Sequence, residues 1–404
     1  MSKKILIFST NYLPNIGGAE IAVKHITDKL GAETTNGNRE YHFDMIVPRI
    51  DGGLARKEDI GVVTIHRVGM GINLDKFLVP FLGYFKAVEL HRINKYDTVW
   101  SIMASQASIA AAFFKMSYKN VPLVLTLQEG DEEDHLKRYV GGNTFLYNLL
   151  IRPWHNLVFK KADLITAISN YLKTRALEKD VEASIKVIPN GVDIELFSQT
   201  ITPEQKSTIA SKLGKREDDK FLITTSRLVK KNSVKDIIDS LVFLPEEIKL
   251  VVIGGGAEYS SLRERAHDKK VAERVQFLGP LDQTEVARFL SVGDVFVRTP
   301  ISEGFGNVFV EAMAAGLPVV ATNVGGISDF LENEKTGLFV DVENPEDIAE
   351  KVKILLKDNR LRKRLITAGQ KLVKERYDWS IVAKEMSTAL SDIEVLNKIN
   401  KEEE

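Results

Sequence analysis

The sequence predicts an α/β fold made of two doubly wound domains of similar size. Its 404 residues are enough for two to three domains that each bury a core. Short apolar runs alternate with helical patterns along the chain, and this alternation favours parallel sheets with helices on both faces. The alternation stops after Phe197 and later starts afresh, so the chain is expected to divide there.

The first series of strands begins near the amino terminus. Residues 4–9, KILIFS, form a continuous apolar run that is typical of a buried strand. A loop with Pro14, Gly17 and Gly18 follows, and apolar residues at helical spacing run from Ile21 to Leu30. Further strands are expected at residues 44–47, 98–101, 123–127, 164–168 and 185–188.

A polar stretch at residues 198–219 separates the two series. It contains Pro203 and the charged run KREDD, and we interpret it as a linker. Strands of the second series are expected at residues 221–225, 250–253, 275–278, 295–298, 319–322 and 338–340. Ligands of open α/β sheets bind outside the carboxyl ends of the strands, so the informative residues should lie in loops just after strands.

Composition excludes several classes of function. Lys and Arg total 55 against 56 Asp and Glu, a net charge of −1, which gives no global basic field for nucleic acid. The chain has no cysteine, so disulfides, thiolate metal sites and cysteine nucleophiles are excluded. The first apolar run is too short for a secretory signal, and serines interrupt the run at 99–114. We therefore expect a cytoplasmic protein.

Two loops have the character of anion sites. Gly17 and Gly18 precede a helix, where backbone N–H groups can approach an anion, although a plain tight turn explains them equally well. Arg227 follows the strand FLITTS, with Lys230 and Lys231 close behind. These cations suit a diphosphate leaving group, and a solvated basic loop is the alternative.

The segment SEGFGNVFVEAMAA, after the strand VFVRT, combines two glycines, a helix start and two glutamates. A carboxylate can accept two hydrogen bonds from a vicinal diol, so Glu303 and Glu311 suit a ligand with a sugar at one end and a ribose at the other. Either glutamate alone could instead complement the helix dipole. A further motif, Pro-Asn-Gly at residues 189–191, is by itself only a turn.

Together these motifs resemble the retaining GT-B glycosyltransferases of family four, also called group one. The matching pieces run in the family's order from about residue 17 to 380: GGAE, VIPNGVDIELF, SRLVKK, SEGFGNVFVEAMAAGLPVVAT with its E-x7-E spacing, NVGGISDFL, TGLFVDVENPEDIA and RYDWS. The resemblance implies a GT-B fold, in which two Rossmann-like domains face a central cleft. Residues 1–198 would form the acceptor side and 199–378 the donor side. A last helix at 379–404, anchored by Trp379, would return to the first domain.

The resemblance also implies an activity. A sugar would pass, with retained configuration, from a UDP- or GDP-sugar to a hydroxyl of a glycan or lipid-linked acceptor, in cell-envelope or extracellular glycan assembly. A nucleotide-sugar epimerase or sugar phosphorylase of the same fold, or a nucleotide-sugar-binding protein without turnover, is the alternative. No metal or other cofactor is expected, because the chain lacks an Asp-x-Asp motif and fixed cations can replace Mg²⁺ at the diphosphate.

The resemblance assigns the family's site residues to the positions of this sequence that match the family's motifs. The catalytic residues would be Arg227 and Lys231, at the leaving diphosphate, and Glu303, at the donor sugar. Glu311 would hold the ribose hydroxyls. The other donor contacts would be Gly17, Gly18, Phe305, Gly306, Asn307 and Val308.

Two positions depart from the family pattern. Many members read Arg-Leu-x-x-x-Lys-Gly, but here the last pair is Asn232-Ser233, so Lys231 is favoured over Lys230 as the phosphate cation. Many members also carry a histidine where this chain has Gln128, after the strand LVLTL. Gln128 can bind a sugar hydroxyl but does not titrate near neutral pH. Gln128 and Asn190 are the candidate acceptor or sugar contacts.

A stretch between residues 137 and 161 mixes aromatic and basic residues. Such helices can lie in a membrane interface, which would make the protein peripheral at the inner face of a membrane. An ordinary core helix with a solvated edge is the alternative.

Overall fold

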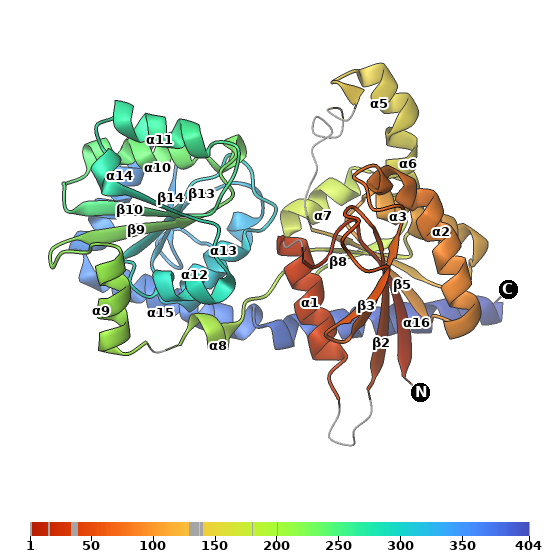
Figure 1. Ribbon diagram of the computed structural model, residues 1–404. Helices are drawn as coiled ribbons and strands as arrows, with labels where there is room; N and C mark the ends of the chain where they lie inside the picture. The colour runs from red at the N-terminus through yellow and green to blue at the C-terminus, as the bar shows by residue number, and fades with distance from the viewer. Residues whose placement is uncertain are drawn as a thin grey trace. The chain divides into compact units, whose positions relative to one another are not determined.

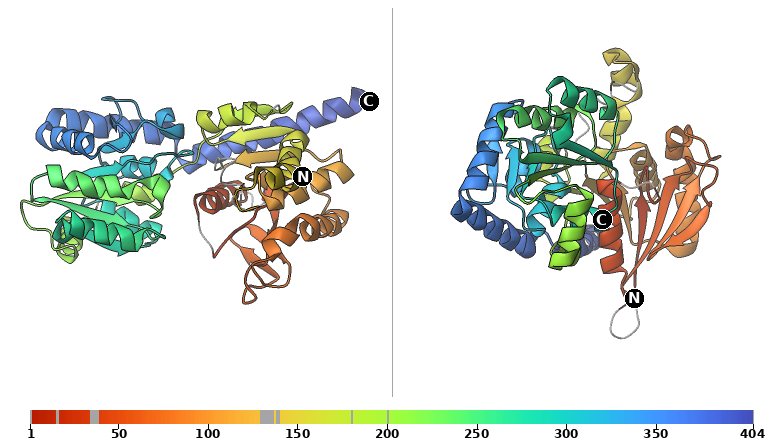
Figure 2. Two further views of the ribbon diagram at one scale, coloured as in Figure 1. Left: turned by 90° about the horizontal axis from the view of Figure 1, so that it is seen from above. Right: turned by 60° about the vertical axis from the view of Figure 1, so that its left-hand side comes forward.

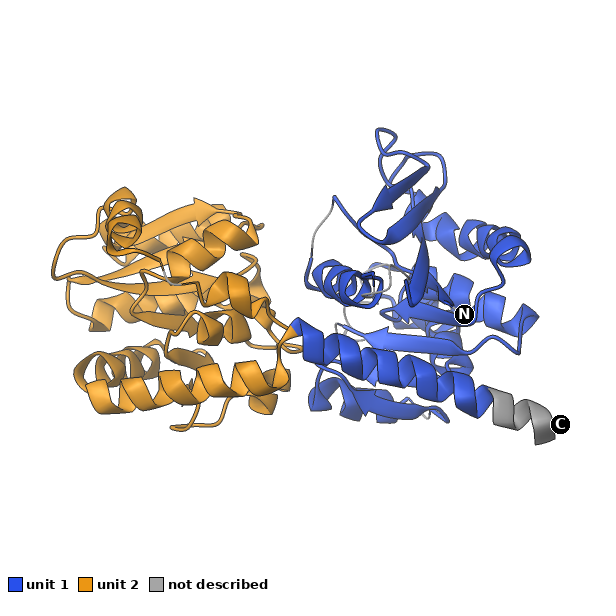
Figure 3. Ribbon diagram, turned by 90° about the horizontal axis from the view of Figure 1, so that it is seen from below, with its two compact units in different colours: residues 1–190, 379–404 blue, residues 191–378 orange. Residues whose placement is uncertain are grey.

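The computed structural model describes residues 2–14, 17–33, 39–128, 137, 140–179, 181–199 and 201–403. Contacts along the chain divide it into two compact units (Figure 3). Unit 1 combines residues 1–190 with 379–404, and unit 2 is residues 191–378. The first division therefore falls after Asn190, ahead of the position expected at 198, while the last helix joins unit 1.

Unit 1 is built on an eight-stranded sheet with the order β3-β4-β2-β1-β5-β6-β7-β8. Its strands are β1 (Lys3–Phe8), β2 (Tyr41–Pro48), β3 (Lys57–Ile60), β4 (Val63–Val68), β5 (Thr98–Ile102), β6 (Leu123–Leu127), β7 (Leu164–Ala167) and β8 (Ser184–Val187). Neighbours pair in parallel except β3 with β4. The sequence pattern does not predict β3 and β4, because β3 is a polar edge strand, KEDI, and β4 mixes polar with apolar residues.

Helices cover both faces of this sheet (Figure 2). The helices of unit 1 are α1 (Gly18–Leu30), α2 (Asp75–Asn94), α3 (Gln106–Ser117), α5 (Thr144–Leu150), α6 (Arg152–Lys161), α7 (Asn170–Leu177) and α16 (Trp379–Glu403). The start of α16 completes the core beside α1, because Trp379 is buried and its ring stacks on His25 at 4.9 Å between centroids. Farther along, the Tyr41 hydroxyl and the Ser387 hydroxyl lie 2.8 Å apart.

Unit 2 is built on a six-stranded parallel sheet with the order β11-β10-β9-β12-β13-β14 (Figure 1). Its strands are β9 (Lys220–Thr225), β10 (Ile248–Ile253), β11 (Val275–Gly279), β12 (Val295–Arg298), β13 (Val319–Thr322) and β14 (Leu338–Val340). The chain starts in the middle, winds to one edge and then to the other. This order creates a topological switch point between β9 and β12, where ligands of doubly wound sheets bind.

The helices of unit 2 show that the expected linker at residues 198–219 is partly helical. They are α8 (Ile194–Phe197), α9 (Pro203–Lys212), α10 (Val234–Ser240), α11 (Tyr259–Asp268), α12 (Gln283–Leu290), α13 (Asn307–Ala314), α14 (Pro345–Lys357) and α15 (Asn359–Arg376). The expected linker at 198–219 thus contains α9. Thr202 and Gln205 form a capping box, in which each side chain accepts a hydrogen bond from the other's backbone N–H. Pro203 then starts the helix, where its missing N–H costs no hydrogen bond.

Candidate functional site

The loops that follow β9, β12 and β13 meet at the switch point of unit 2. The Ile301 N–H, after β12, donates to the Lys231 carbonyl, after β9, at 2.7 Å. The Gly326 N–H, after β13, donates to the Glu303 carbonyl at 3.0 Å. The motifs around Arg227, Glu303 and the NVGG sequence are therefore one assembly.

Three consecutive glycines after β10 support the loop that carries Arg227. A Cβ at Gly254 would lie 1.9 Å from the Ser226 carbonyl oxygen, and one at Gly256 would lie 2.4 Å from that of Leu228. Both glycines also have positive φ. Larger residues there would displace the backbone on both sides of Arg227. This run is not among the predicted site residues, although three glycines directly after an expected strand are a signal that the sequence carries.

The departure at Asn232-Ser233 has a structural role. The buried Asn232 side chain donates from Nδ2 to the Arg227 carbonyl at 2.7 Å. Ser233 has a φ of 46°, a conformation for which glycine is the usual choice. The charged side chains of Arg227, Lys230 and Lys231 remain exposed. The loop therefore keeps its shape and three cations without the lysine of the family pattern.

Glu303 is held by an arginine that the sequence analysis did not single out. Arg298, the last residue of β12, is only 6% exposed. Its Nη1 donates to Glu303 Oε2 at 2.5 Å, and its Nη2 donates to Asn232 Oδ1 at 3.2 Å. A polar chain thus runs from the Arg227 carbonyl through Asn232 and Arg298 to the Glu303 carboxylate. A charged residue at the end of the apolar strand VFVR was the available signal.

The backbone of the SEGFGN loop is fixed by close contacts. Gly306 is the N-cap of α13 with a φ of 93°. A Cβ at Gly325 would lie 1.9 Å from the Glu303 carbonyl oxygen, so the NVGG glycine lets the β13 loop approach. The Phe305 ring is buried against Phe330 and Tyr377, at 5.2 and 5.6 Å between centroids. Phe305 can therefore offer a ligand only its backbone, next to the half-buried Asn307 and Val308 at the helix start.

Glu311 lies on α13 and is buried. Burial raises the pKa of its carboxyl group to about 7, and a hydrogen bond from Gln283 opposes the rise. Without a ligand, this side chain is therefore partly protonated at neutral pH.

This pKa predicts a pH-dependent effect of Glu311→Gln on stability. Between pH 4.5 and about 7 the unfolded chain releases the Glu311 proton while the folded chain retains it, so the wild type loses stability as pH rises. The variant has no such loss. It should match the wild type at pH 4 and exceed it at pH 8 by up to roughly 3 kcal/mol. Urea unfolding at both pH values measures this, with Glu264→Gln on exposed α11 as control. An equal difference at both pH values would contradict the raised pKa.

The expected residues of unit 1 form two separate groups. Gly17 is the N-cap of α1, and a Cβ there would lie 2.6 Å from the Glu20 carboxylate. Gln128 and Asn190 form a reciprocal, buried amide pair, with N–O distances of 3.0 and 2.9 Å. These residues belong to unit 1, whereas Arg227, Lys231 and both site glutamates belong to unit 2.

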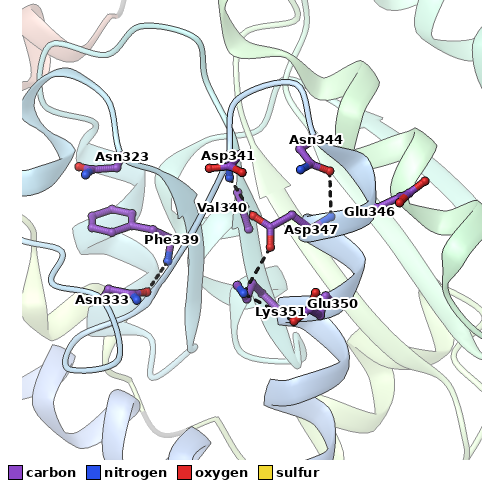
Figure 4. A pocket seen from close by; sticks show the side chains of 10 residues that line it. All are labelled: Asn323, Asn333, Phe339, Val340, Asp341, Asn344, Glu346, Asp347, Glu350 and Lys351. Carbon is purple, nitrogen blue, oxygen red and sulfur yellow. Dashed lines mark hydrogen bonds and ion pairs between the residues drawn. The ribbon is translucent and has the colours of Figure 1, made fainter.

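A polar hollow in unit 2 includes none of the expected residues (Figure 4). It lies between β14 and the start of α14, and one of its carboxylates, that of Asp347, has two partners within the hollow. Asp347 accepts a hydrogen bond from the Asp341 N–H at 2.9 Å and pairs with Lys351 at 3.3 Å. The Asn344 side chain caps α14. These interactions give Asp347, Asn344 and Lys351 a role in the fold.

Comparisons with known proteins agree with the motifs. The family described as "Glycosyl transferases group 1" matches residues 205–372, and "Glycosyltransferase Family 4" matches residues 16–196. The chain is 32% identical to an uncharacterized glycosyltransferase of Methanocaldococcus jannaschii over 397 residues, which cover 95% of this chain and 96% of that protein.

Two further proteins extend the comparison. A Corynebacterium glutamicum protein is 29% identical, with 96% of this chain and 98% of that protein covered, and is named GDP-mannose-dependent monoacylated alpha-(1-6)-phosphatidylinositol monomannoside mannosyltransferase. The crystal structure of Anabaena HepE in complex with UDP and glucose has a TM-score of 0.76 at 20% identity, over 96% of this chain and all of that chain. The similarity to HepE concerns the fold. The chain belongs to the group 1, or family four, glycosyltransferases and has the GT-B fold.

Proposed function

We propose that this glycosyltransferase moves a hexose-type sugar from a UDP- or GDP-sugar to an acceptor hydroxyl with retention of configuration. The observation that carries the proposal is the convergence of Arg227, Glu303 and the start of α13 at the switch point of unit 2. It supplies cations for a diphosphate and an oriented carboxylate for a sugar.

In the proposed reaction, the bond between the sugar C1 and the diphosphate oxygen breaks. The acceptor oxygen forms its bond to C1 on the same face, and the acceptor proton passes to the departing phosphate oxygen. Arg227 and Lys231 stabilise the charge that grows on the diphosphate. Glu303 accepts hydrogen bonds from the donor sugar, while Arg298 holds its carboxylate in place. Glu311 holds the ribose hydroxyls.

The names of similar proteins support a glycan or lipid-linked acceptor. The C. glutamicum relative is named for a phosphatidylinositol mannoside. We propose a role in cell-envelope or extracellular glycan assembly. Gln128 and Asn190 are the proposed acceptor-side contacts, which requires their amide pair to open or to offer its remaining lone pairs.

Product analysis tests this function. The donors are UDP-glucose, UDP-N-acetylglucosamine and GDP-mannose, chosen by thermal shift, since a ligand at 100 times its Kd stabilises by about 2.7 kcal/mol. We expect a glycoside with the anomeric configuration of the donor, read by NMR. An inverted glycoside would overturn the mechanism. An epimerised nucleotide sugar, or binding with no product, would replace the function with one of the two alternatives.

Activity is expected to persist in excess EDTA. Fixed cations at Arg227 and Lys231, with the N-terminus of α13, are proposed to stabilise the leaving diphosphate in place of Mg²⁺. Initial rates with EDTA, and with Mg²⁺ or Mn²⁺ restored, should agree within about twofold. Loss of turnover in EDTA that returns with either metal would contradict this leaving-group chemistry.

A further inference from the structure

Large apolar side chains stand in solvent along α2 and the loop before it. Within residues 70–85 the exposed ones include Met70, Leu74, Phe77, Phe81 and Phe85, of which Phe81 is 59% and Phe85 67% exposed. The positions 74, 77, 78, 81 and 85 follow helical spacing, so they form a stripe on one face of α2. Isolated exposed apolar residues are ordinary, but a contiguous stripe of this length marks an interaction surface.

The loop before α2 is held rigidly in this exposed arrangement. The carboxylate of the buried Asp75 accepts hydrogen bonds from the Gly71 N–H at 2.7 Å and the Ile72 N–H at 3.1 Å. A Cβ at Gly69 would collide with this carboxylate, and Gly69 has positive φ. Binding of a partner to Met70 and Leu74 therefore requires no additional ordering of the loop.

The stripe continues onto α6 through a chain of aromatic rings. Phe81 on α2 contacts Phe113 on α3 at 6.2 Å between centroids, and Phe113 contacts Trp154 on α6 at 5.8 Å. Tyr147 and Phe159 are buried, as the core-helix reading of residues 137–161 expected. Other apolar side chains of α5 and α6 are exposed, and among them Phe145 is 72% exposed.

The charged residues of this surface are mainly basic. Between residues 70 and 86 the only acidic residue is the buried Asp75, while Lys76 and Lys86 are basic, and Lys86 pairs at 2.8 Å with the exposed Glu89 farther along α2. The helices α5 and α6 contain no acidic residue and include Arg152, Lys160 and Lys161. Apolar side chains bordered by cations fit an anionic bilayer, in which rings enter the headgroup region and cations meet lipid phosphates.

A second copy of the chain fits this surface less well. A two-fold contact would place the surface against itself, so its basic residues would meet basic residues. None of the helices that the structure describes combines the length and the apolar character of a membrane span.

We propose that α2, α5 and α6 form a face with which unit 1 docks on an anionic membrane. This inference goes beyond the transfer reaction. The two fail separately, because vesicle binding is measured with neither donor nor acceptor present.

Co-sedimentation of the full chain with vesicles tests the docking face. The vesicles are phosphatidylcholine alone or an equal mixture with phosphatidylglycerol, at low and high salt. The wild type should pellet with the mixed vesicles at low salt and less at high salt. The double variant Phe81→Ser/Phe85→Ser should bind at least about tenfold more weakly, because two rings no longer enter the interface. Phe243→Ser, at an exposed phenylalanine of unit 2, is the matched control and should bind like wild type.

Charge reversal provides a second test that leaves the rings intact. Lys76→Glu/Arg152→Glu should weaken binding to mixed vesicles by at least about tenfold, and Lys371→Glu on α15 should not. Wild-type protein that stays in solution with mixed vesicles at low salt would overturn the proposal. So would a dimer in light scattering that Phe81→Ser/Phe85→Ser alone dissociates, since a second copy would then cover the face.

Discussion

Arg227→Ala is expected to lower kcat/KM by about 10²–10³-fold, the largest effect of any single substitution in the site. The diphosphate is bound in the ground state and gains charge as it leaves, so both donor affinity and turnover should fall. Calorimetry with the nucleoside diphosphate and steady-state rates with the donor measure the two parts.

The two neighbouring lysines are internal controls for Arg227. All three side chains are exposed on the same loop, so each alanine variant removes one exposed positive charge from that loop. Lys231→Ala should fall between Arg227→Ala and wild type, whereas Lys230→Ala should stay within about twofold of wild type. If Arg227→Ala and Lys230→Ala behave alike, the loop is merely a solvated basic turn.

Glu303→Ala is expected to lower turnover by about 10- to 100-fold, the range of a charged hydrogen bond, while affinity for the bare nucleoside diphosphate changes little. The reason is that Glu303 is assigned to the sugar next to the reacting carbon. Glu311→Ala should show the opposite pattern and weaken nucleotide binding, since Glu311 is assigned to the ribose. Calorimetry beside steady-state kinetics separates the two. Unchanged turnover and affinity in both variants would favour the helix-dipole explanation of these glutamates.

Arg298 allows a sharper version of the Glu303 test. If Arg298 acts by holding Glu303, Arg298→Met should lower kcat, and the double variant with Glu303→Ala should be no worse than Glu303→Ala alone. Arg298→Lys should restore part of kcat, because it keeps a charge near Glu303. Additive losses in the double variant would mean that Arg298 has a separate role. Thermal unfolding must accompany these assays, because removal of a buried arginine leaves Glu303 and Asn232 short of a partner.

The sequence predicted the inner strands β10, β12 and β13 of unit 2 closely because they are buried parallel strands with mostly continuous apolar runs. The prediction failed where the local spacing of apolar residues carries less information about secondary structure. The edge strand β3 is polar, and α9 has no buried residue, so neither has an apolar period to detect. The local signs of α9 were the capping box at Thr202 and the proline at the first helical position, Pro203.

The same limit applies to the site. Arg227, Glu303 and Glu311 lie in motifs that can be read along the chain. Arg298 acts through Asn232 and Glu303, which come from other positions in the sequence and meet only in the fold. Likewise, the pairing of Gln128 with Asn190 depends on β6 and β8 delivering both amides to one place.

The return of α16 to unit 1 sets an order of events during synthesis. Residues 191–378 form a unit whose two ends lie together, since the Val192 N–H donates to the Tyr377 carbonyl at 2.7 Å. Unit 1, by contrast, needs Trp379, Val382, Met386 and Leu390 to fill its core. On the ribosome, unit 2 therefore has its full complement of residues first, although it is second along the chain. The surface of the first 190 residues that α16 covers therefore stays exposed until the ribosome has synthesised the whole of unit 2, which is inserted between them and α16.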